Sequence, residues 1–379
     1  MDIACYSVSQ KRCCQMNWMR EEFFDLDDPT TYSYDPSGVY GWLEKSDQNL
    51  EIARKYFFEN QPLEITPSRE ITNVVICGMG GSAIAGDLAW SVAARDLKVP
   101  CTIVRGYMLP AWVGPGTLLI VVSYSGNTEE AVWCYSQGFN RKADVVAIST
   151  GGAIAEMANR HGVPHLKLDC DYPAPRLALT HLLPAVLYVL SQCFEGFEFF
   201  NDALRDAVQS VKRGLNRYTR DLPFDKNFAK RLAYDIQGTF PVIVASEQTM
   251  PAAMRFAAQL NENGKWPAHA SVIPEMNHNE VVAYGQPGPA TKRCGIIFIR
   301  DKDDHPRVQF RQDFTIDLVE KNAAWVHQIK GEGKTFLARL FSILQTADFA
   351  SYYLAIGRGL DPMNIRAIDT LKERLGKLK

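Results

Sequence analysis

The sequence lacks the charge excess and the long apolar runs that mark several classes of protein. Its 379 residues include 41 Lys and Arg against 43 Asp and Glu, which gives a formal net charge of −2. Proteins that bind nucleic acid or an anionic membrane surface usually carry more basic than acidic residues, so we expect neither kind of partner. The longest apolar stretch, Leu182 to Leu190, contains Pro184 and has about half the length of a membrane span.

The chain also shows few signs of disulfide or metal chemistry. It has nine cysteines, an odd number, and neither a Cys-x-x-Cys spacing nor ligand-spaced histidines. A disulfide framework and a zinc site are therefore poor interpretations, and we predict no metal site. The first residues include Asp2, Lys11 and Arg12 but not the apolar core of a signal peptide. These features favour a protein of the reducing cytoplasm.

Changes in pattern divide the chain into three parts. Residues 1–38 carry three cysteines, an acidic cluster and a turn-rich stretch, so we predict a loosely ordered N-terminal extension. From residue 71 short β-branched runs alternate with helical segments, and the pattern restarts near residue 226. Continuous apolar strands that alternate with helices are typical of a parallel sheet covered on both faces. We therefore predict an α/β fold with two doubly wound domains, residues 39–220 and 221–379, in which helices flank mainly parallel sheets.

The expected strands are short and apolar, and a helix over residues 40–58 is expected before them. The strands span residues 73–77, 101–104, 117–122, 144–148 and 163–168 in the first domain, and residues 241–245, 268–273, 294–299 and 325–329 in the second.

A glycine-rich turn follows the first predicted strand. Gly78, Gly80 and Gly81 precede Ser82 and a helical segment, and glycines at such a place let an anion approach the N-terminus of a helix. The same turn matches a dinucleotide-binding fingerprint, although the next strand ends at Arg105 and not at an acidic residue. Arg105 suits a 2′-phosphate, so an NADP-dependent dehydrogenase stays open as an alternative, as does a purely structural turn.

A second polar turn follows the buried strand at 117–122. Ser123, Ser125 and Thr128 supply three hydroxyls just before a helix, where hydroxyls and unpaired N–H groups form a neutral cradle for phosphate. A nucleotide-binding loop would need a lysine, which this turn lacks, so the turn suits a monophosphate without Mg²⁺. Helix capping by Asn127 or Thr128 is the alternative, but capping alone does not call for Ser123 and Ser125 as well.

Four segments together resemble one known family. The two turns read GMGGSAIAGD at 78–87 and SYSGNTEE at 123–130, and two later blocks read QLNENGKWPA at 259–268 and PEMNHNE at 274–280. The turns are similar to those of sugar isomerase (SIS) domains, and the later blocks are similar to the signature of bifunctional phosphoglucose/phosphomannose isomerases. The resemblance covers residues 40–379, and it implies two flavodoxin-like SIS domains, a phosphosugar substrate and a homodimer.

The resemblance implies an aldose–ketose isomerase. It would interconvert glucose 6-phosphate, and mannose 6-phosphate, with fructose 6-phosphate through a metal-free cis-enediol and without a cofactor. Such a reaction needs a base that carries a proton between C2 and C1, and Glu262 suits this role because a partly desolvated carboxylate at a helix end can be tuned as a general base. It also needs an acid to open the sugar ring, and His278 fits that role, which the family supplies across its dimer interface.

Two further catalytic or sugar-binding residues follow from the resemblance. Arg176 follows Pro173 and Pro175, which fix the backbone before it, and it matches the family arginine that faces the enediolate oxygen. Lys372 matches the lysine of the last family helix, which reaches the sugar. The chain departs from the family at Gly264, where alanine is common.

The predicted phosphate ligands all belong to the two polar turns. They are Gly80, Gly81, Ser82, Ser123, Ser125 and Thr128.

Two other functions stay open on the sequence. One is another SIS phosphosugar isomerase, acting on an aminosugar phosphate, and the other is a non-catalytic phosphosugar-binding regulator. SIS regulators usually carry a DNA-binding helix-turn-helix, and residues 1–38 are too short, too acidic and too turn-rich to form one. The preference between the glucose and mannose epimers depends on the geometry of the pocket, which the residue pattern does not encode.

Overall fold

The first sheet contains the five strands expected between residues 73 and 168. The computed structural model describes residues 22–60 and 63–377. Its first sheet is wholly parallel and has the strand order β2-β1-β3-β4-β5, which is the order of flavodoxin-like folds. The prediction of a doubly wound α/β fold is therefore confirmed. The strands are β1 (Asn73–Cys77), β2 (Cys101–Val104), β3 (Thr117–Val122), β4 (Asp144–Ser149) and β5 (His165–Lys167).

Helices cover both faces of this sheet because its central strands are apolar on both sides. β3 is buried along its whole length, and its residues alternate between two apolar clusters. Leu119 and Val121 pack with α4 and α5, whereas Leu118 and Ile120 pack with α3 and α6. These helices are α3 (Gly81–Ala93), α4 (Glu129–Asn140), α5 (Gly152–His161) and α6 (Leu179–Cys193).

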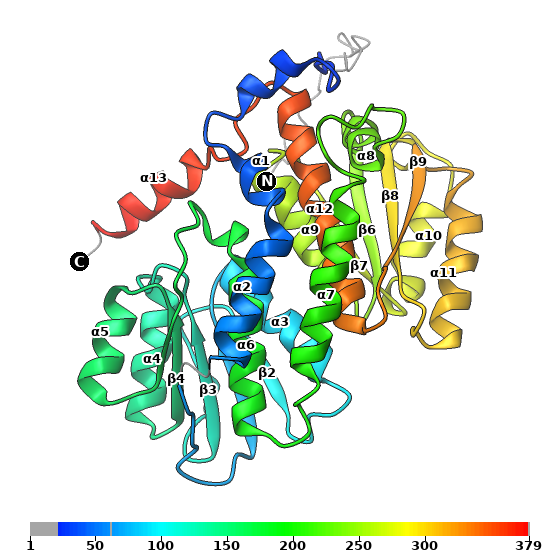
Figure 1. Cartoon of the computed structure of the whole chain (residues 1–379). Coiled ribbons are helices and arrows are strands. Elements are labelled where there is room, and N and C mark those ends of the chain that lie inside the picture. Colours follow the sequence, from blue (N-terminus) through cyan, green and yellow to red (C-terminus); the bar gives the residue numbers. More distant parts are fainter. Residues whose placement is uncertain (1–21, 61–62, 378–379) are drawn as a thin grey trace, which may run out of the picture.

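The second sheet repeats the pattern with four parallel strands in the order β7-β6-β8-β9. Its outer face carries α10 and α11, and its inner face carries α8, α9 and α12 (Figure 1). The strands are β6 (Phe240–Ser246), β7 (His269–Ile273), β8 (Cys294–Arg300) and β9 (Trp325–Lys330). The helices are α8 (Phe228–Ile236), α9 (Met250–Glu262), α10 (Glu280–Tyr284), α11 (Pro306–Val319) and α12 (Phe336–Gly357).

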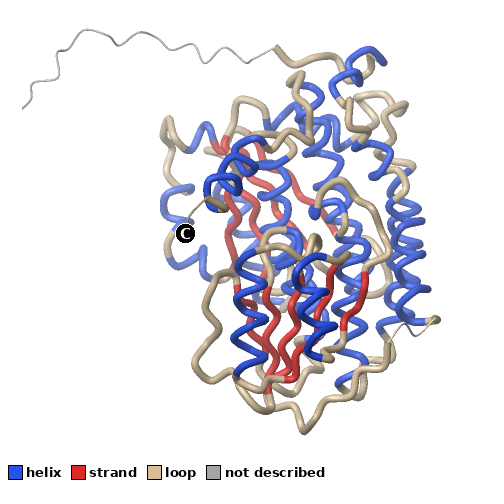
Figure 2. Tube along the Cα trace, turned by 90° about the vertical axis from the view of Figure 1, so that its left-hand side faces the viewer, coloured by secondary structure: helices blue, strands red, loops and turns tan. Residues whose placement is uncertain are grey.

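A layer of helices between the sheets joins the two halves into one core. α12 is the longest helix in the described part of the chain, and it is apolar around most of its circumference because it is buried on all sides. It packs against α8, α9 and α7 (Phe200–Leu215), while α2 (Ser46–Phe58) packs against α6 and α7. One apolar cluster therefore runs from the first sheet to the second, and in Figure 2 the strands of both sheets lie among these helices.

The remaining elements are short connections and the last helix. The helix expected over 40–58 is broken at Glu44 and Lys45 into α1 (Val39–Leu43) and α2. The boundary between domains at residue 220 follows α7 and stays a prediction. The other elements are the 3₁₀ turns η2 (Pro175–Leu177), η3 (Glu275–His278) and η4 (Thr291–Arg293), and α13 (Arg366–Leu375).

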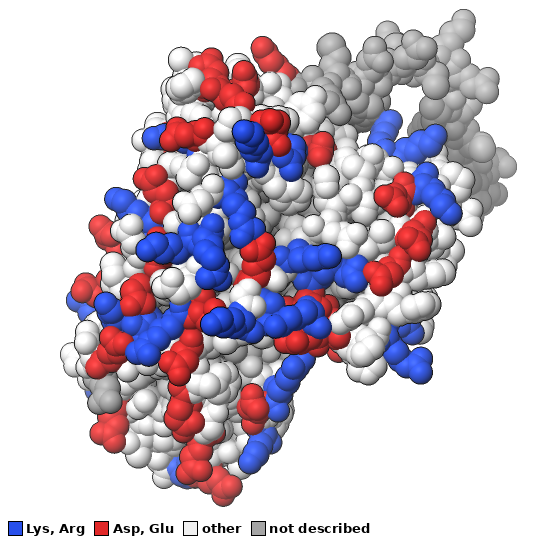
Figure 3. Space-filling model, turned by 45° about the vertical axis from the view of Figure 1, so that its right-hand side comes forward, with Lys and Arg blue, Asp and Glu red and all other residues white. Residues whose placement is uncertain are grey.

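Two surface properties bear on the expected partners. No helix among residues 22–60 and 63–377 is both long and apolar enough to cross a membrane. On the face shown in Figure 3, Lys and Arg are interspersed with Asp and Glu, as the near-zero net charge of −2 leads one to expect.

The expectation of a loosely ordered extension is wrong for residues 22–38. This segment contains η1 (Pro29–Tyr34) and packs against the end of α12, where Phe24 N donates to Gly357 O at 2.6 Å. The three N-terminal cysteines and the rest of residues 1–21 lie outside the described residues.

One acidic residue of this segment, Asp27, pairs with a buried cation of the second half. Lys230 on α8 has no exposed surface, and its ammonium donates to Asp27 Oδ1 at 2.8 Å and to Leu26 O at 2.8 Å. Asp27 also accepts from Phe224 N at 2.9 Å. An acidic cluster next to turn residues looks disordered in sequence because its partner lies 203 residues away.

Replacing Asp27 with alanine should lower the free energy of unfolding by about 2 kcal/mol, because the buried Lys230 ammonium loses a carboxylate partner. Equilibrium denaturation followed by circular dichroism measures the change. Glu22→Ala, an exposed acidic residue of the same segment, is the control and should change the free energy by less than about 0.5 kcal/mol. Equal effects of the two substitutions would show that the segment is not anchored through Asp27.

Candidate active site

Three polar turns meet at the carboxyl edge of the first sheet, one each after β1, β3 and β4. The second and third turns cross closely, and Gly126 and Gly152 have positive φ angles of 70° and 71°. A Cβ on Gly126 would lie 1.7 Å from the carbonyl oxygen of Gly151, so only glycine fits at this crossing. The packing of the turns, and not phosphate alone, therefore requires glycine within the SYSGNT segment.

The predicted phosphate residues lie in these turns, but their hydroxyls have different partners. Ser82 Oγ accepts a hydrogen bond from Tyr124 N at 3.2 Å and so joins the first turn to the second. Ser123 is fully buried, and its hydroxyl donates to Thr128 Oγ1 at 3.0 Å. Ser125 is exposed and Thr128 is half-buried. Ser123 thus shapes the loop from within, while Ser125 and Thr128 present hydroxyls at its surface.

The helices that leave the first two turns begin without side-chain caps. Thr128 at the N-cap of α4 makes no capping bond, and neither does Gly80 at the N-cap of α3. Asn127 instead accepts from Ala153 N, in α5, at 3.0 Å. The capping alternative therefore does not describe α4. The first N–H groups of α4 lack intrahelical partners and suit an anion. In α3, Ser82 N and Ala83 N donate to Met79 O at 3.0 and 3.4 Å, so the N–H groups of Gly80 and Gly81 are the ones that suit an anion at that turn.

The glycine turn touches the predicted catalytic arginine directly. A Cβ on Gly81 would lie 2.9 Å from Pro175 O and 3.1 Å from Arg176 N. Glycine at this position therefore lets η2 lie against the first residue of α3. The contact connects the phosphate turns to the cluster around Arg176.

Arg176 and Glu262 form the centre of this cluster. Arg176 is 3% exposed, and its Nη1 lies 3.4 Å from Glu262 Oε2. Its Nε donates to Asn263 Oδ1 at 2.8 Å and its Nη2 to Pro362 O at 3.0 Å. Burial lowers the pKa of Arg176, and the neighbouring carboxylate of Glu262 opposes that shift. The result is a fixed guanidinium in ionic contact with the candidate base.

A lysine clamps the end of the helix that carries Glu262. α9 ends at Glu262, and the chain turns sharply because Lys265 has a positive φ of 51°. The Lys265 ammonium donates to the carbonyl oxygens of Glu262 and Asn263 at 2.9 and 3.1 Å, and to those of Asp361 and Pro362 at 2.8 and 2.9 Å. Sequence reasoning did not single out Lys265, although a basic residue just after a helix is a signal for such capping.

The departure at Gly264 also has a structural reason. A Cβ at this position would lie 2.6 Å from Leu354 Cδ2 on α12 and 2.8 Å from Leu260 O. Glycine here lets the end of α9 pack closely against α12.

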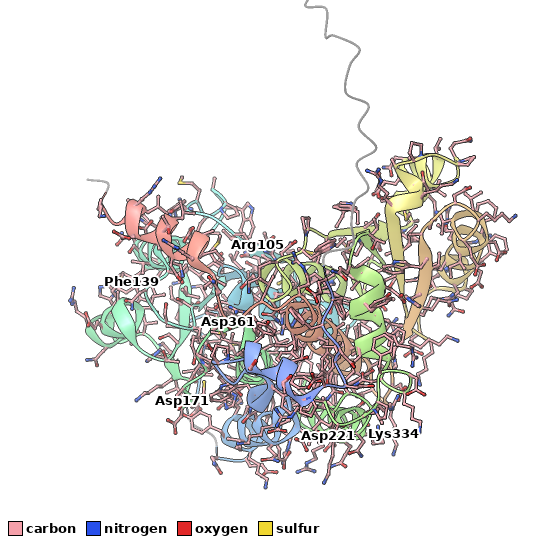
Figure 4. All side chains as sticks on the ribbon, turned by 90° about the horizontal axis from the view of Figure 1, so that it is seen from above. Arg105, Phe139, Asp171, Asp221, Lys334 and Asp361 are labelled. Carbon is pink, nitrogen blue, oxygen red and sulfur yellow. The ribbon has the colours of Figure 1, made fainter. Side chains whose placement is uncertain are left out.

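A cavity of about 440 Å³ opens beside Glu262 and Lys265, and it is also lined by Asp361 and by the start of α13. Small-molecule sites are of this size. Figure 4 places Asp361 near the middle of the molecule. The cavity thus gives a small substrate access to the carboxylate from one side.

His278 lies apart from this cluster. It is exposed at the end of η3, and its neighbour Met276 packs with Val242 on the outer face of the second sheet. α9, which ends at Glu262, packs on the inner face through Leu260. The sheet therefore separates the His278 imidazole from the Glu262 carboxylate within one chain.

Lys372 makes no direct contact with the cluster. It lies on α13, which has no buried residue. Within the described ranges no hydrogen bond or ion pair joins its ammonium to Arg176 or Glu262.

The alternative of NADP binding depended on a free Arg105. Its guanidinium instead forms an ion pair with Asp87 on α3, so the cation is already neutralised within the protein. In the part of the chain that the structure describes, no group of three or more His, Cys, Asp or Glu side chains is placed to hold a metal ion.

The matching family model and the curated relatives that are more than 30% identical to this chain agree on one family. A model described as the bacterial phospho-glucose isomerase C-terminal SIS domain matches residues 225–375. A bifunctional phosphoglucose/phosphomannose isomerase of Caldicellulosiruptor bescii is 35% identical over 82% of this chain and 92% of its own length. One from Aquifex aeolicus is 32% identical over 85% of this chain and 95% of its own length.

The fold also matches a solved structure. A glucose-6-phosphate isomerase-like protein from Thermus thermophilus superposes with a TM-score of 0.59 at 16% identity, over 92% of this chain and 99% of its own. At 16% identity the match shows only that the two folds are similar.

The environment of Lys265 predicts a pH dependence of stability. Burial and the nearby Arg176 cation lower the pKa of Lys265 from 10.5 to about 8. Between these two values the unfolded chain binds this proton more tightly than the folded chain, so the contribution of Lys265 to the free energy of unfolding rises with pH. The difference in that free energy between wild type and Lys265→Met should increase from about pH 7 to about pH 10. The exposed control Lys321→Met should show a flat difference, and a flat difference for Lys265→Met would contradict the account.

Proposed function

Because this chain belongs to the bifunctional phosphoglucose/phosphomannose isomerase family, we propose that its active site is the cluster between the two sheets. This site interconverts glucose 6-phosphate, and mannose 6-phosphate, with fructose 6-phosphate. The observation that carries the assignment is the ion pair between the buried Arg176 and the partly exposed Glu262, which contacts the phosphate turns through Gly81. Aldose–ketose isomerisation moves one proton and one double bond, so a base and a fixed cation supply its main needs.

The phosphate group is bound at the carboxyl edge of the first sheet. The N–H groups of Gly80 and Gly81 at the start of α3 donate to the phosphate, together with the hydroxyls of Ser82, Ser125 and Thr128. Ser123 keeps Thr128 in place through its hydrogen bond of 3.0 Å. Neutral donors of this kind hold a monophosphate without a basic surface, which agrees with the net charge of −2.

Glu262 carries the proton in the isomerisation step. After the ring has opened, the carboxylate takes the proton from C2 of the aldose, and the electron pair moves onto O1 to give an enediolate. The proton of the O2 hydroxyl then passes to O1, and Glu262 returns the abstracted proton to C1 while the double bond forms between C2 and O2, which gives the ketone. Arg176 lies beside the carboxylate, where it stabilises the charge that develops on oxygen.

The same step accounts for both aldose substrates. Glucose 6-phosphate and mannose 6-phosphate differ only in configuration at C2. The planar enediol has no stereocentre at that carbon, so the common intermediate forms from either epimer.

We also propose a homodimer in which each subunit supplies His278 to the site of the other. The second sheet separates His278 from Glu262 within one chain, so a partner is needed to bring them together. Large apolar side chains are exposed on the same outer face, namely Val282 at 69%, Phe310 at 70% and Phe314 at 56%. Such a patch suits a subunit interface.

The remaining assignments belong to the same proposal. Residues 39–220 form the phosphate-binding domain, and residues 221–379 form the domain that carries Glu262. Lys372 contacts the sugar from α13, whose first turn lines the cavity beside the base. The described cysteines are free thiols, which supports a place in the cytoplasm, where thiols stay reduced.

Glu262→Gln should lower kcat by about 10²–10⁴-fold, because the amide cannot accept the C2 proton. Coupled assays with glucose 6-phosphate, mannose 6-phosphate and glucosamine 6-phosphate measure the change, with and without EDTA. Binding of fructose 6-phosphate should persist, and the exposed control Glu247→Gln should keep wild-type turnover. An unchanged kcat for Glu262→Gln, or turnover of glucosamine 6-phosphate alone, would contradict the proposal.

Mixing Glu262→Gln and His278→Asn subunits tests the shared site. Each variant alone should be nearly inactive, whereas subunit exchange should restore about a quarter of wild-type activity, because half of the dimers are hybrids with one complete site each. Recovery is measured after reversible dissociation and reassembly of the mixture. If His278 acts within its own chain, no hybrid has a complete site and no activity returns.

A further inference from the structure

The backbone of Arg176 is held as firmly as its guanidinium. η2 is a single turn of three residues, so it cannot fix the arginine by itself. The carbonyl oxygen of Arg176 accepts a hydrogen bond from Arg255 Nη2 at 3.0 Å. Arg255 lies on α9, two turns before Glu262, and it is 4% exposed. The helix that carries Glu262 therefore also holds the main chain of Arg176, through this hydrogen bond from Arg255.

Arg255 is held in turn by a carboxylate on α12. Its Nη2 donates to the two oxygens of Asp348 at 2.8 and 3.1 Å. One turn further along α9, Gln259 Nε2 donates to Asp348 Oδ1 at 2.6 Å. One turn further again, Asn263 Nδ2 donates to Ser351 Oγ at 3.0 Å. These five residues form a polar seam between two apolar helices, and the seam ends at the active site.

Stability is a poor explanation for this seam. Buried ion pairs roughly break even against apolar residues of similar volume, because both charges lose their hydration. In addition, Arg255 Nε has no hydrogen-bond partner among the described residues, which adds a desolvation cost. Hydrogen-bonded pairs with fixed geometry do, however, define the relative position of the elements that they join.

We propose that Asp348 and Arg255 are positioning residues for the isomerisation, an inference that rests on the proposed function. They set the separation between the guanidinium of Arg176 and the carboxylate of Glu262 by fixing η2 and α9 against α12. Neither residue lines the cavity beside Glu262, so neither is placed to touch the substrate.

Asp348→Asn keeps the shape of the side chain and removes its charge, which weakens its interaction with Arg255. We expect kcat to fall by about 10–100-fold, because a misplacement of about 1 Å at a reacting centre has effects of this size. The KM for fructose 6-phosphate should stay within about threefold, since the phosphate turns are untouched. Added to Glu262→Gln, the same substitution should lower kcat by less than about threefold, because it acts through a base that is already absent.

Asp301→Asn is the matched control. Asp301 forms a buried pair with Arg339, at 2.6 Å, and both side chains are at most 2% exposed. This pair joins the loop after β8 to α12 away from Arg176, so its loss should lower the thermal midpoint while kcat stays within about twofold. If Asp348→Asn does not fold, Arg255→Lys takes its place, because lysine keeps the charge but loses the fork of donors.

The outcomes distinguish a failure of the positioning role from a failure of the proposed isomerase function. A loss of kcat without a change in KM that disappears in the Glu262→Gln background supports the positioning role. An unchanged kcat, a loss that adds fully to that of Glu262→Gln, or an equal loss in Asp301→Asn overturns it. A wild-type enzyme without isomerase activity overturns the proposed function itself.

Discussion

The guanidinium of Arg176 lies where water cannot solvate it, and much of the structure around the site follows from that constraint. A buried cation is tolerable only when its hydrogen bonds are supplied by the protein. Those bonds come from three places: Asn263 just after α9, Pro362 in the loop after α12, and Glu262 itself. The same segments are clamped together by Lys265. The two halves of the chain thus meet at one arginine, and the candidate base is held at a defined distance from it.

The two sheets have related topologies, but the proposed phosphate site uses the first sheet. At the carboxyl edge of the first sheet, glycines and small hydroxyl residues leave the starts of α3 and α4 uncapped. At the corresponding edge of the second sheet, Arg339 forms a buried pair with Asp301 and a second ion pair with Asp303. The second half contributes instead the carboxylate of Glu262, at the C-terminal end of α9. In the proposed function one half binds the phosphate and the other supplies the base.

The local features of the fold and the turns could be read from the sequence, because they depend on residues close together in the chain. The expected strands and the two polar turns belong to this class. The flavodoxin-like fold, and the roles of Arg176 and Glu262, which are 86 residues apart and lie together in the structure, were predicted from the family resemblance instead. Interactions between residues far apart in the sequence could not be predicted from the local residue pattern. Asp27 meets Lys230 across 203 residues, and Arg255 meets the carbonyl of Arg176 across 79.

His278 shows another limit of sequence reasoning. It lies only 16 residues after Glu262, and the residues between them do not show that the two side chains lie on opposite faces of the second sheet. β7 and the turn after it carry His278 to the other face of the second sheet. Whether two residues share a face depends on how the chain passes around the sheet, and a residue pattern does not record that path.

The central claim is that a carboxylate beside a fixed cation moves a proton through an enediol. The most direct measurement follows hydrogen at C1 and C2 by NMR while the enzyme equilibrates fructose 6-phosphate with its aldoses in D₂O. The account predicts that deuterium enters the C1 position of fructose 6-phosphate and the C2 position of the aldoses over many turnovers, and that Glu262→Gln incorporates none over the same time. Complete retention of protium by the active enzyme would show a hydride shift and would contradict the account.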